Sequence, residues 1–167
     1  MPPFTIFSRN PDTLIKLRTE LCDSAVPHIP AYAQIRDLPY LDAVIKEAMR
    51  LFLLVNLPLE HVVPAGGATM AGHFFHQGTT VDILPSVIHK NKAVVGEDVE
   101  AFRPERWLEA GPEKLREMEA AHMGSSKGKR ACLGQHMARL QMKKLIPALL
   151  MKIDVSVTLY ILLEMMN

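Results

Sequence analysis

The stretch GKRACLG, residues 128–134, decides how this 167-residue chain is interpreted. It places Cys132 between Gly128 and Gly134, directly before a segment that is expected to be helical. The positive end of a helix dipole, together with Arg130, favours a thiolate over a thiol, and a thiolate is the form that binds iron. The glycines let the backbone approach a flat cofactor closely. For an isolated cysteine, a buried structural role beside a helix cap is the commoner outcome.

The segment after this stretch is predicted to form a helix from Leu133 to about Met151. Pro147 interrupts it at a nominal cost of ~3 kcal/mol, so we expect a kink or a local compensation there. The apolar content of this helix comes from Met137, Leu140, Met142, Leu145 and Leu149.

A second motif lies upstream, on a helix that is predicted from about Leu38 to Phe52. Glu47 and Arg50 are three residues apart, so the carboxylate and the guanidinium share one face of the helix and can pair. Alone this is a weak signal, because exposed pairs of this kind are common and contribute only ~0 to 1 kcal/mol. The apolar stripe of the same helix consists of Leu41, Val44, Ile45, Ala48 and Phe52.

The remaining elements are weaker predictions. A first helix is expected near Asn10 and Pro11, because Asn can cap the free N–H groups and Pro suits the first helical position. Glycines divide residues 61–88 into β-favouring stretches, which indicates short strands in hairpins. Residues 89–126 are polar and irregular, with a short helix predicted at residues 112–121.

The order of the motifs carries more information than any one of them. Glu-x-x-Arg on a helix is followed by a small sheet, then FRPERW at residues 102–107, then GxRxCxG opening a helix. FRPERW alone is typical of a surface turn with buried aromatic anchors. In this order the chain resembles the C-terminal part of a fungal cytochrome P-450, and it is similar to the pisatin-demethylase-like branch in LPYLDAVIKEAMRLF, HVVPAGGATMAGHFFHQGTTV and HKNKAVVGEDVEAFRPERWLE.

The resemblance implies a mainly α fold with small β hairpins, an α+β fragment that forms the C-terminal portion of the cytochrome P-450 fold. Residues 1–167 are then expected to be a single partial domain, the proximal, haem-side half of a larger monooxygenase domain. Residues 155–167 do not resemble the usual tail of the family. Because family members are much longer, the segments for oxygen activation and most of substrate recognition are expected to be absent.

The resemblance also assigns roles to residues around the cysteine. Cys132 would be the proximal thiolate ligand of the iron in haem b, which is iron protoporphyrin IX. Arg130 would pair with a haem propionate, and Gly128 and Gly134 would shape the loop. His61 stands where related sequences usually place an arginine that reaches the other propionate. A strand histidine that is satisfied locally is an equally open interpretation of His61.

Three charged residues match the buried charge network that the family places behind the haem: Glu47, Arg50 and Arg106. By resemblance, this network stabilises the core and does not carry out oxygen chemistry, so no catalytic residue is assigned in this chain. His89 also matches a position that is often histidine, and we give it no separate role.

The cysteine segment departs from the family pattern at two positions. Ser125 stands where an aromatic residue usually packs near the sulfur, and Ser126 stands where a glycine is typical. Loss of the aromatic ring is expected to expose the thiolate and to change its hydrogen bonding, which tunes a bound metal.

Composition limits the partners and the compartment. Hydrophobic residues make up 49% and charged residues 22% of the chain, which is typical of a globular protein, and a net charge of +1 argues against nucleic acid as the partner. No signal peptide or spanning segment is visible, so no membrane anchor is expected in this chain. The two cysteines, Cys22 and Cys132, favour a reducing compartment, although a disulfide between them stays open.

By resemblance, the parent activity inserts one oxygen atom of O2 into a small organic substrate with electrons from an NADPH-dependent reductase. The family usually works on the cytoplasmic side of the endoplasmic reticulum. This chain is expected to be inactive alone, and the alternative is a non-catalytic remnant with weak or no haem binding. A further alternative is an unrelated domain that uses Cys132 as a redox-sensing or zinc-binding thiol, with His122 and His136 nearest in sequence.

Overall fold

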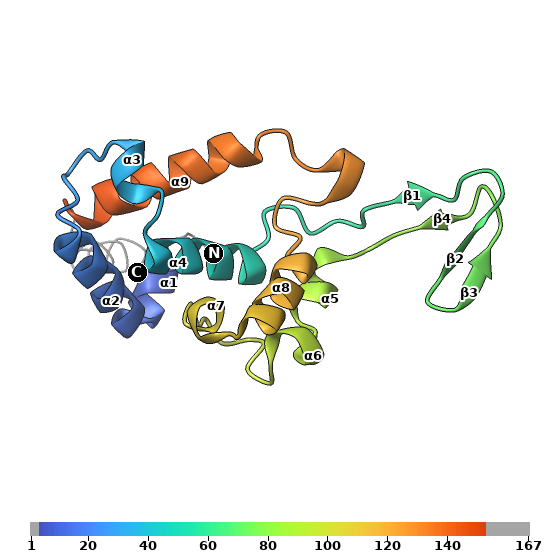
Figure 1. Cartoon of the computed structure of the whole chain (residues 1–167), viewed down its shortest axis with the longest axis horizontal. Coiled ribbons are helices and arrows are strands. Elements are labelled where there is room, and N and C mark those ends of the chain that lie inside the picture. Colours follow the sequence, from blue (N-terminus) through green and yellow to red (C-terminus); the bar gives the residue numbers. More distant parts are fainter. Residues whose placement is uncertain (1–3, 153–167) are drawn as a thin grey trace, which may run out of the picture.

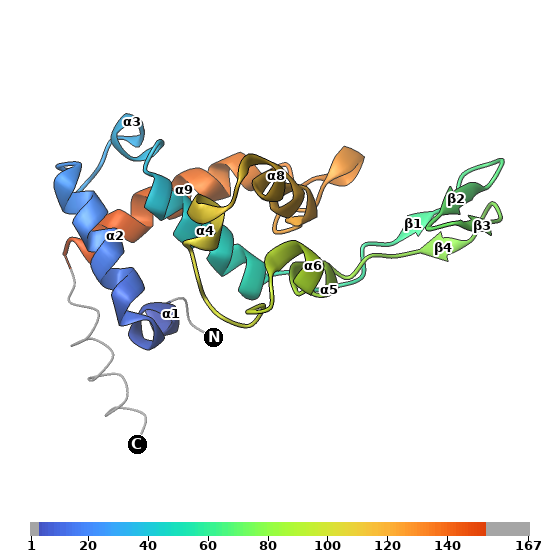
Figure 2. The same ribbon diagram turned by 60° about the horizontal axis from the view of Figure 1, so that its bottom comes forward.

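The computed structural model describes residues 4–152 of the chain. A body of helices forms one end of the molecule, and a narrow β arm extends from it (Figure 1). The division into body and arm is equally clear when the molecule is turned by 60° (Figure 2). Helices with two small antiparallel strand pairs confirm the α+β fold class. The atypical tail at residues 155–167 lies outside the described residues.

Three helices form the centre of the body: α2 (Pro11–Asp23), α4 (Pro39–Leu51) and α9 (Gln135–Leu150). Their apolar side chains meet in one cluster, together with residues from the segment between α2 and α4. Full burial of one such side chain contributes about 1.5–3 kcal/mol relative to leaving it exposed, so this cluster holds the three helices together. The cluster members without exposed surface are Leu17, Leu21, Ile35 and Leu41.

The N-terminal part of the body contains α1 (Phe4–Arg9) and α2. Pro11 is the first residue of α2, as predicted. Asn10 does not cap this helix, and that part of the prediction was wrong. The side-chain amide of Asn10 turns back instead and donates a hydrogen bond to the carbonyl of Ile6 at 2.8 Å, so it satisfies the end of α1 rather than the start of α2.

Helix α4 follows the single turn α3 (Tyr32–Ile35) and begins with a cap that comes from a distant residue. The carboxylate of Glu20 accepts hydrogen bonds from the backbone amides of Tyr40 and Leu41, at 2.7 and 2.8 Å. Phe52 is 43% exposed because the chain leaves the helix there, so it does not belong to the buried stripe. The predicted stripe residues that are buried are Leu41, Val44 and Ile45.

The arm is one hairpin nested inside another. Strand β1 (His61–Val62) pairs with β4 (Thr80–Val81), and β2 (Ala68–Met70) pairs with β3 (His73–Phe75), both in antiparallel register. Ala71 and Gly72, between β2 and β3, both have positive φ, which is the pattern of a type I′ turn. The predicted hairpins are confirmed, although the last strand ends at Val81.

Short helices follow the arm. Helix α5 (Pro85–His89) lies almost entirely in the range predicted as strands, so that prediction was wrong after Val81. The stretch that was expected to be irregular contains α6 (Lys92–Val95) and α7 (Arg106–Glu109), and all three helices have five residues or fewer. Such lengths do not complete the two turns that an apolar periodicity needs to become visible. Helix α8 (Pro112–Ala121) has the predicted bounds.

Helix α9 starts two residues later than predicted. A 3₁₀ turn, η1 (Gly128–Arg130), precedes it, and Leu133 remains outside the helix with 99% of its surface exposed. The helix continues through Pro147 to Leu150 as one element. Lys143 is buried in α9 although its side chain is charged. Its ammonium group donates to the Arg36 carbonyl at 2.7 Å and pairs with Asp42 of α4, and these contacts compensate the charge.

No helix within residues 4–152 combines the length and the apolar content that crossing a bilayer requires.

Candidate functional site

Glu47 of α4 has no exposed surface, and its carboxylate accepts hydrogen bonds from four other residues. Oε1 accepts from Nη2 of Arg50 and Nε of Arg106, both at 2.9 Å, and from the backbone amide of Arg103 at 3.0 Å. Oε2 accepts from Nε of Arg50 at 2.9 Å and from the indole N–H of Trp107 at 3.0 Å. These five residues are called the Glu47 network below. The structure therefore brings together the predicted trio of one glutamate and two arginines.

The two buried arginines of the Glu47 network use their other donors on backbone carbonyl groups and on one further carboxylate, that of Asp98. Arg50 donates to the carbonyl groups of His89, Val99 and Ala101. Arg106 donates to the Asp98 carboxylate at 3.0 Å and to the carbonyl groups of Val95, Asp98 and Ala101. The accepting carbonyls all belong to residues 89–101, so the network also fixes the path of this largely non-helical segment.

The electrostatics of Glu47 follow from this arrangement. Burial, the largest influence, raises the pKa of its carboxyl group. The hydrogen bonds and charge of Arg50, the amide of Arg103 and the charge of Arg106 together outweigh burial and hold the pKa below its ordinary value. Glu47 is therefore an anion whose charge is compensated inside the protein. Its role is structural, because a carboxyl group that stays ionised cannot donate a proton.

Trp107 is a member of the Glu47 network that sequence reasoning did not assign. It is 5% exposed, and its ring lies at 5.5 Å from that of His122 in an edge-to-face arrangement. The sequence carried part of the signal, since the FRPERW segment was interpreted as having buried aromatic anchors. The indole N–H bond to Glu47 has no sequence signature of its own.

The cysteine loop, residues 123–134, connects α8 to α9. Cys132 is a free, exposed thiol, and its backbone amide donates to the carbonyl of Ser125 at 2.9 Å, which closes the loop. Ser126 and Gly128 have φ values of 58° and 74°, in the left-handed region. Gly128 adopts this conformation without strain, whereas the side chain of Ser126 makes the same conformation costly.

The other residues predicted for the site fall in two places. Arg130 is exposed in η1, and Gly134 lies next to the thiol, because a Cβ atom there would stand 3.8 Å from the sulfur of Cys132. His61 lies on β1 in the arm and is exposed. Its Nδ1–H group donates to the Leu59 carbonyl at 2.8 Å, so it is satisfied locally. The structure therefore gathers the glycines, the arginine and the cysteine in one loop and places the histidine in the arm.

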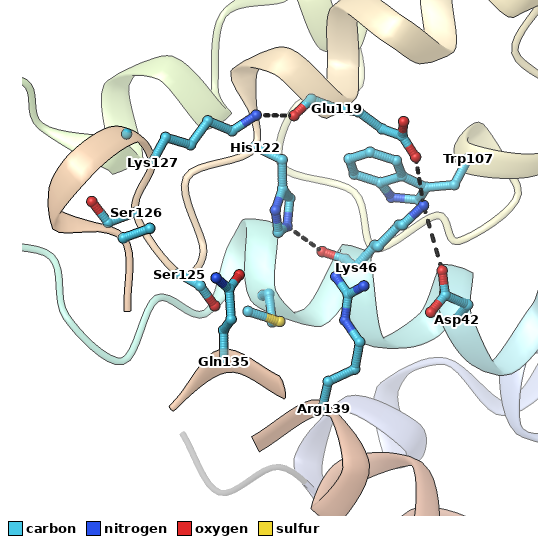
Figure 3. A pocket seen from close by; sticks show the side chains of 13 residues that line it. Asp42, Lys46, Trp107, Glu119, His122, Ser125, Ser126, Lys127, Gln135 and Arg139 are labelled. Atoms are coloured by element: carbon cyan, nitrogen blue, oxygen red, sulfur yellow. Dashed lines mark hydrogen bonds and ion pairs between the residues drawn. The ribbon is translucent and has the colours of Figure 1, made fainter. Parts of the chain in front are cut away.

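A pocket of about 550 Å³ lies between residues 125–131 of the cysteine loop, α4 and the start of α9 (Figure 3). Lys46 reaches into it and pairs with Glu119 at 2.8 Å and with Asp42 at 3.4 Å. Ser125 lines this pocket. The walls are thus mixed in polarity, and the positive charge of Lys46 lies between two carboxylates.

Two histidines pack together between the Glu47 network and the cysteine loop. The rings of His89 and His122 stack at 5.2 Å between centroids. Burial lowers the pKa of His89. Burial, with a smaller contribution from the neighbouring charge of His89, lowers the pKa of His122 to about 4. Both rings are therefore neutral at pH 7. Sequence reasoning gave neither one a structural role, because stacking between residues 33 positions apart leaves no local pattern.

Within residues 4–152, no three His, Cys, Asp or Glu side chains are grouped so that they could hold a metal ion. The zinc-binding alternative for Cys132 therefore lacks the additional ligands that a zinc site requires. Cys22 is also free and exposed, so the two cysteines do not form a disulfide.

Comparison with known proteins gives one consistent result. The sequence model of the cytochrome P-450 family matches residues 4–159. The chain is 46% identical over 151 residues to a cytochrome P-450 monooxygenase of Aspergillus terreus, covering 88% of this chain and 31% of that protein. Similar enzymes of Aspergillus flavus and Emericella nidulans are each 40% identical, with 89% and 87% of this chain covered and 30% and 29% of theirs. The chain thus spans about a third of the length of these relatives.

Proposed function

This chain belongs to the cytochrome P-450 family, and on that premise we propose that it supplies the proximal side of a haem-thiolate monooxygenase, with Cys132 as the iron ligand. The observation that carries the proposal is the setting of the thiol. Cys132 is exposed, lies in a glycine-bounded loop three residues before the first residue of α9, and is free of any disulfide. A thiol in this setting can be reached by a large flat ligand.

The residues around Cys132 fit haem b. No side chain at Gly128 or Gly134 limits the approach of a macrocycle, and the Gly128 position faces open space. Leu133, adjacent in sequence to the cysteine, has 99% of its surface exposed, and Met137 in the first turn of α9 has 60% exposed. Apolar surface next to a thiol suits a ligand that is apolar over most of its area.

Within this proposal, each loop residue has a distinct task. The Cys132 sulfur donates to iron, and the exposed guanidinium of Arg130 pairs with a propionate. His61 is the candidate partner for the other propionate. Because a carboxylate only accepts, the single N–H group of the neutral ring must exchange the Leu59 carbonyl for the propionate to bind it. The Glu47 network holds α4, α7 and residues 89–101 in place and takes no part in proton transfer.

When bound, haem supplies the redox centre at which O2 is activated, and a thiolate ligand favours cleavage of the O–O bond. The parent reaction would insert one oxygen atom into a small organic substrate, with electrons from an NADPH-dependent reductase. By the resemblance to the pisatin-demethylase-like branch, this reaction would be an oxidation of secondary metabolism on the cytoplasmic side of the endoplasmic reticulum. The similarity to fungal monooxygenases supports the oxidation itself.

The two exposed cysteines allow a test with an internal control. The full chain is incubated with and without haem and then treated with iodoacetamide, and alkylation of each cysteine is followed by mass spectrometry. Haem is expected to protect Cys132 and to leave Cys22 fully reactive, because only Cys132 lies in the glycine-bounded loop. Protection is expected to disappear when excess imidazole competes for the iron.

Equal reactivity of both cysteines at saturating haem would overturn the assignment of Cys132. It would favour instead a chain that keeps the motifs of the family without binding its cofactor.

A further inference from the structure

His89 is the only side chain, within the part of the chain that the structure describes, whose hydrogen bonds join the last turn of α4 to the cysteine loop. Its Nδ1 atom lies 2.9 Å from the carbonyl oxygen of Arg50. Its Nε2 atom lies 2.7 Å from the backbone nitrogen of Met123. Arg50 is a member of the Glu47 network, and Met123 is the first residue of the cysteine loop. One ring therefore connects the two regions.

The partners of His89 select one form of the ring. The Arg50 carbonyl only accepts, so Nδ1 must carry a hydrogen and donate. The Met123 amide only donates, so Nε2 must be bare and accept. Only the neutral Nδ1–H tautomer makes both bonds. With 2% of its surface exposed, His89 cannot exchange either partner for water.

The residues next to Met123 strengthen this attachment. The Nε2–H group of His122 donates to the Lys46 carbonyl of α4 at 3.2 Å. At Gly124, a Cβ atom would lie 2.8 Å from the terminal methyl group of Met49 and 2.8 Å from the His122 ring. Residues 122–124 are thus pressed against α4 without room for a side chain at the third position. The rest of the cysteine loop extends from this docked end to Cys132.

We propose that His89 is a positioning residue for the haem-ligating loop. It fastens the first residue of the loop to α4, so that the loop carrying Cys132 is held in a fixed position relative to the Glu47 network. The fastening itself is independent of haem, and only the statement that the loop carries an iron ligand rests on the proposed function. A residue that sets the start of a loop limits where the exposed thiol at its other end can lie.

The groups that face His89 make the fastening sensitive to acid. Helix α4 presents Arg50 and Glu47, and the segment after α8 presents His122. The positive charges of Lys46 and Lys127 lower the pKa of His122. Helices α6, α7 and α8 contribute uncharged side chains around His89 and His122: Val94, Val95, Trp107 and Met118. Protonation of Nε2 would place two donors, Nε2–H and the Met123 N–H, against each other. The bond to the loop then breaks, while the bond to Arg50 remains.

The test compares three substitutions of His89 in the full chain without haem, by hydrogen–deuterium exchange of peptides from residues 123–134 and from α4. His89→Leu removes both bonds. His89→Gln keeps an acceptor near the Nε2 position, and His89→Asn keeps a donor near the Nδ1 position. Exchange in the cysteine loop is expected to rise about two- to tenfold in the Leu and Asn variants, as for one lost hydrogen bond, and to stay near wild type in Gln.

Val44→Ala is the matched control, because Val44 is buried on α4 and touches neither bond. It is expected to lower overall stability without raising exchange selectively in residues 123–134. If His89→Leu does not fold, the comparison of Gln with Asn decides, since a role in core stability alone predicts equal loop exchange in both. Equal loop exchange in the Gln and Asn variants would overturn the proposal.

A pH profile supplies the second readout. After correction for intrinsic exchange, loop exchange in the wild type is expected to rise as the pH falls below 6.5. The profile of His89→Gln is expected to be shallower, because only His122 still titrates at the docked end of the loop. A wild-type profile no steeper than that of Gln would also overturn the proposal. Failure of the proposed function looks different, since unprotected Cys132 in the alkylation experiment leaves the Gln–Asn contrast intact.

Discussion

The Glu47 network and the cysteine loop are joined through His89, but their polar groups differ in burial and in hydrogen bonding. Glu47, Arg50 and Arg106 are at most 3% exposed, and their donors and acceptors are matched to groups of this chain. In the cysteine loop, Cys132 and Arg130 are exposed, and Ser126 is held in a strained conformation. Folding thus satisfies the polar groups of the network with partners in the chain itself, whereas it leaves the thiol and the guanidinium of the loop exposed.

The largest effect is expected from Glu47→Gln. This change leaves the buried guanidinium group of Arg50 without a counter-charge and leaves Arg106 with Asp98 alone. Removing one partner of a buried ion pair costs about 3–5 kcal/mol. Much of the stability of a domain of this size would be lost. Urea denaturation followed by circular dichroism measures the change in the free energy of unfolding.

Glu97→Gln is the matched control for that substitution. Glu97 pairs with Lys92 at 2.8 Å, but both side chains are largely exposed. Exposed pairs contribute little, so the midpoint of unfolding should not move measurably. Similar losses at the two positions would mean that burial does not distinguish the Glu47 network from surface pairs.

A smaller effect is expected from acid, acting where network and loop meet. The pKa of His122 in the folded chain is about 4, below its ordinary value of 6.5. Its contribution to stability is therefore complete above pH 6.5 and is lost as the pH falls from 6.5 toward 4, with a slope of at most ~1.4 kcal/mol per pH unit. The lowered pKa of His89 acts in the same direction.

Thermal unfolding of the wild type and His122→Phe between pH 7 and pH 4.5 measures this slope. The Phe side chain keeps a ring against His89 but does not titrate, so the variant should lose less stability over that interval than the wild type. Parallel curves would show that His122 is not buried as a neutral ring.

The sequence predicted which charged residues belong to the Glu47 network, but not the hydrogen-bond partners that complete it. Glu47 and Arg50 follow from helical spacing, and Arg106 follows from the resemblance. The partners that complete the network are backbone carbonyls of residues 89–101, and backbone groups look the same in every sequence. The capping of α4 by Glu20 was missed for a similar reason, because the two elements are joined only in three dimensions.

The cysteine loop shows the converse. Its residues were visible in the sequence, including Ser126, which the resemblance matches to a glycine. What could not be read was the docking of residues 122–124 on α4, since His89 lies 34 residues before Met123. Short helices such as α6 and α7 were also missed, because four residues do not display a period.

A further substitution sharpens the contrast from the side of the loop. Ser126 has a φ of 58°, and glycine adopts this region without the steric cost that a side chain imposes. Ser126→Gly is expected to raise the free energy of unfolding by roughly 0.5–1 kcal/mol, less the added entropy of the unfolded chain. Chemical denaturation measures the change.

Ser125→Gly is the neighbouring control, because Ser125 is not among the residues with positive φ. It should be neutral or destabilising. Stabilisation by Ser125→Gly and not by Ser126→Gly would contradict the assignment of strain to Ser126.

In the proposed function, haem binds to the cysteine loop through the sulfur of Cys132. The absorbance spectrum of the full chain, loaded with haem, reduced and exposed to carbon monoxide, tests this directly. We expect a Soret band at the long wavelength typical of thiolate ligation in the wild type and in Cys22→Ala, and its loss in Cys132→Ala. A band typical of histidine-ligated or free haem in the wild type, or no retained haem, would contradict it.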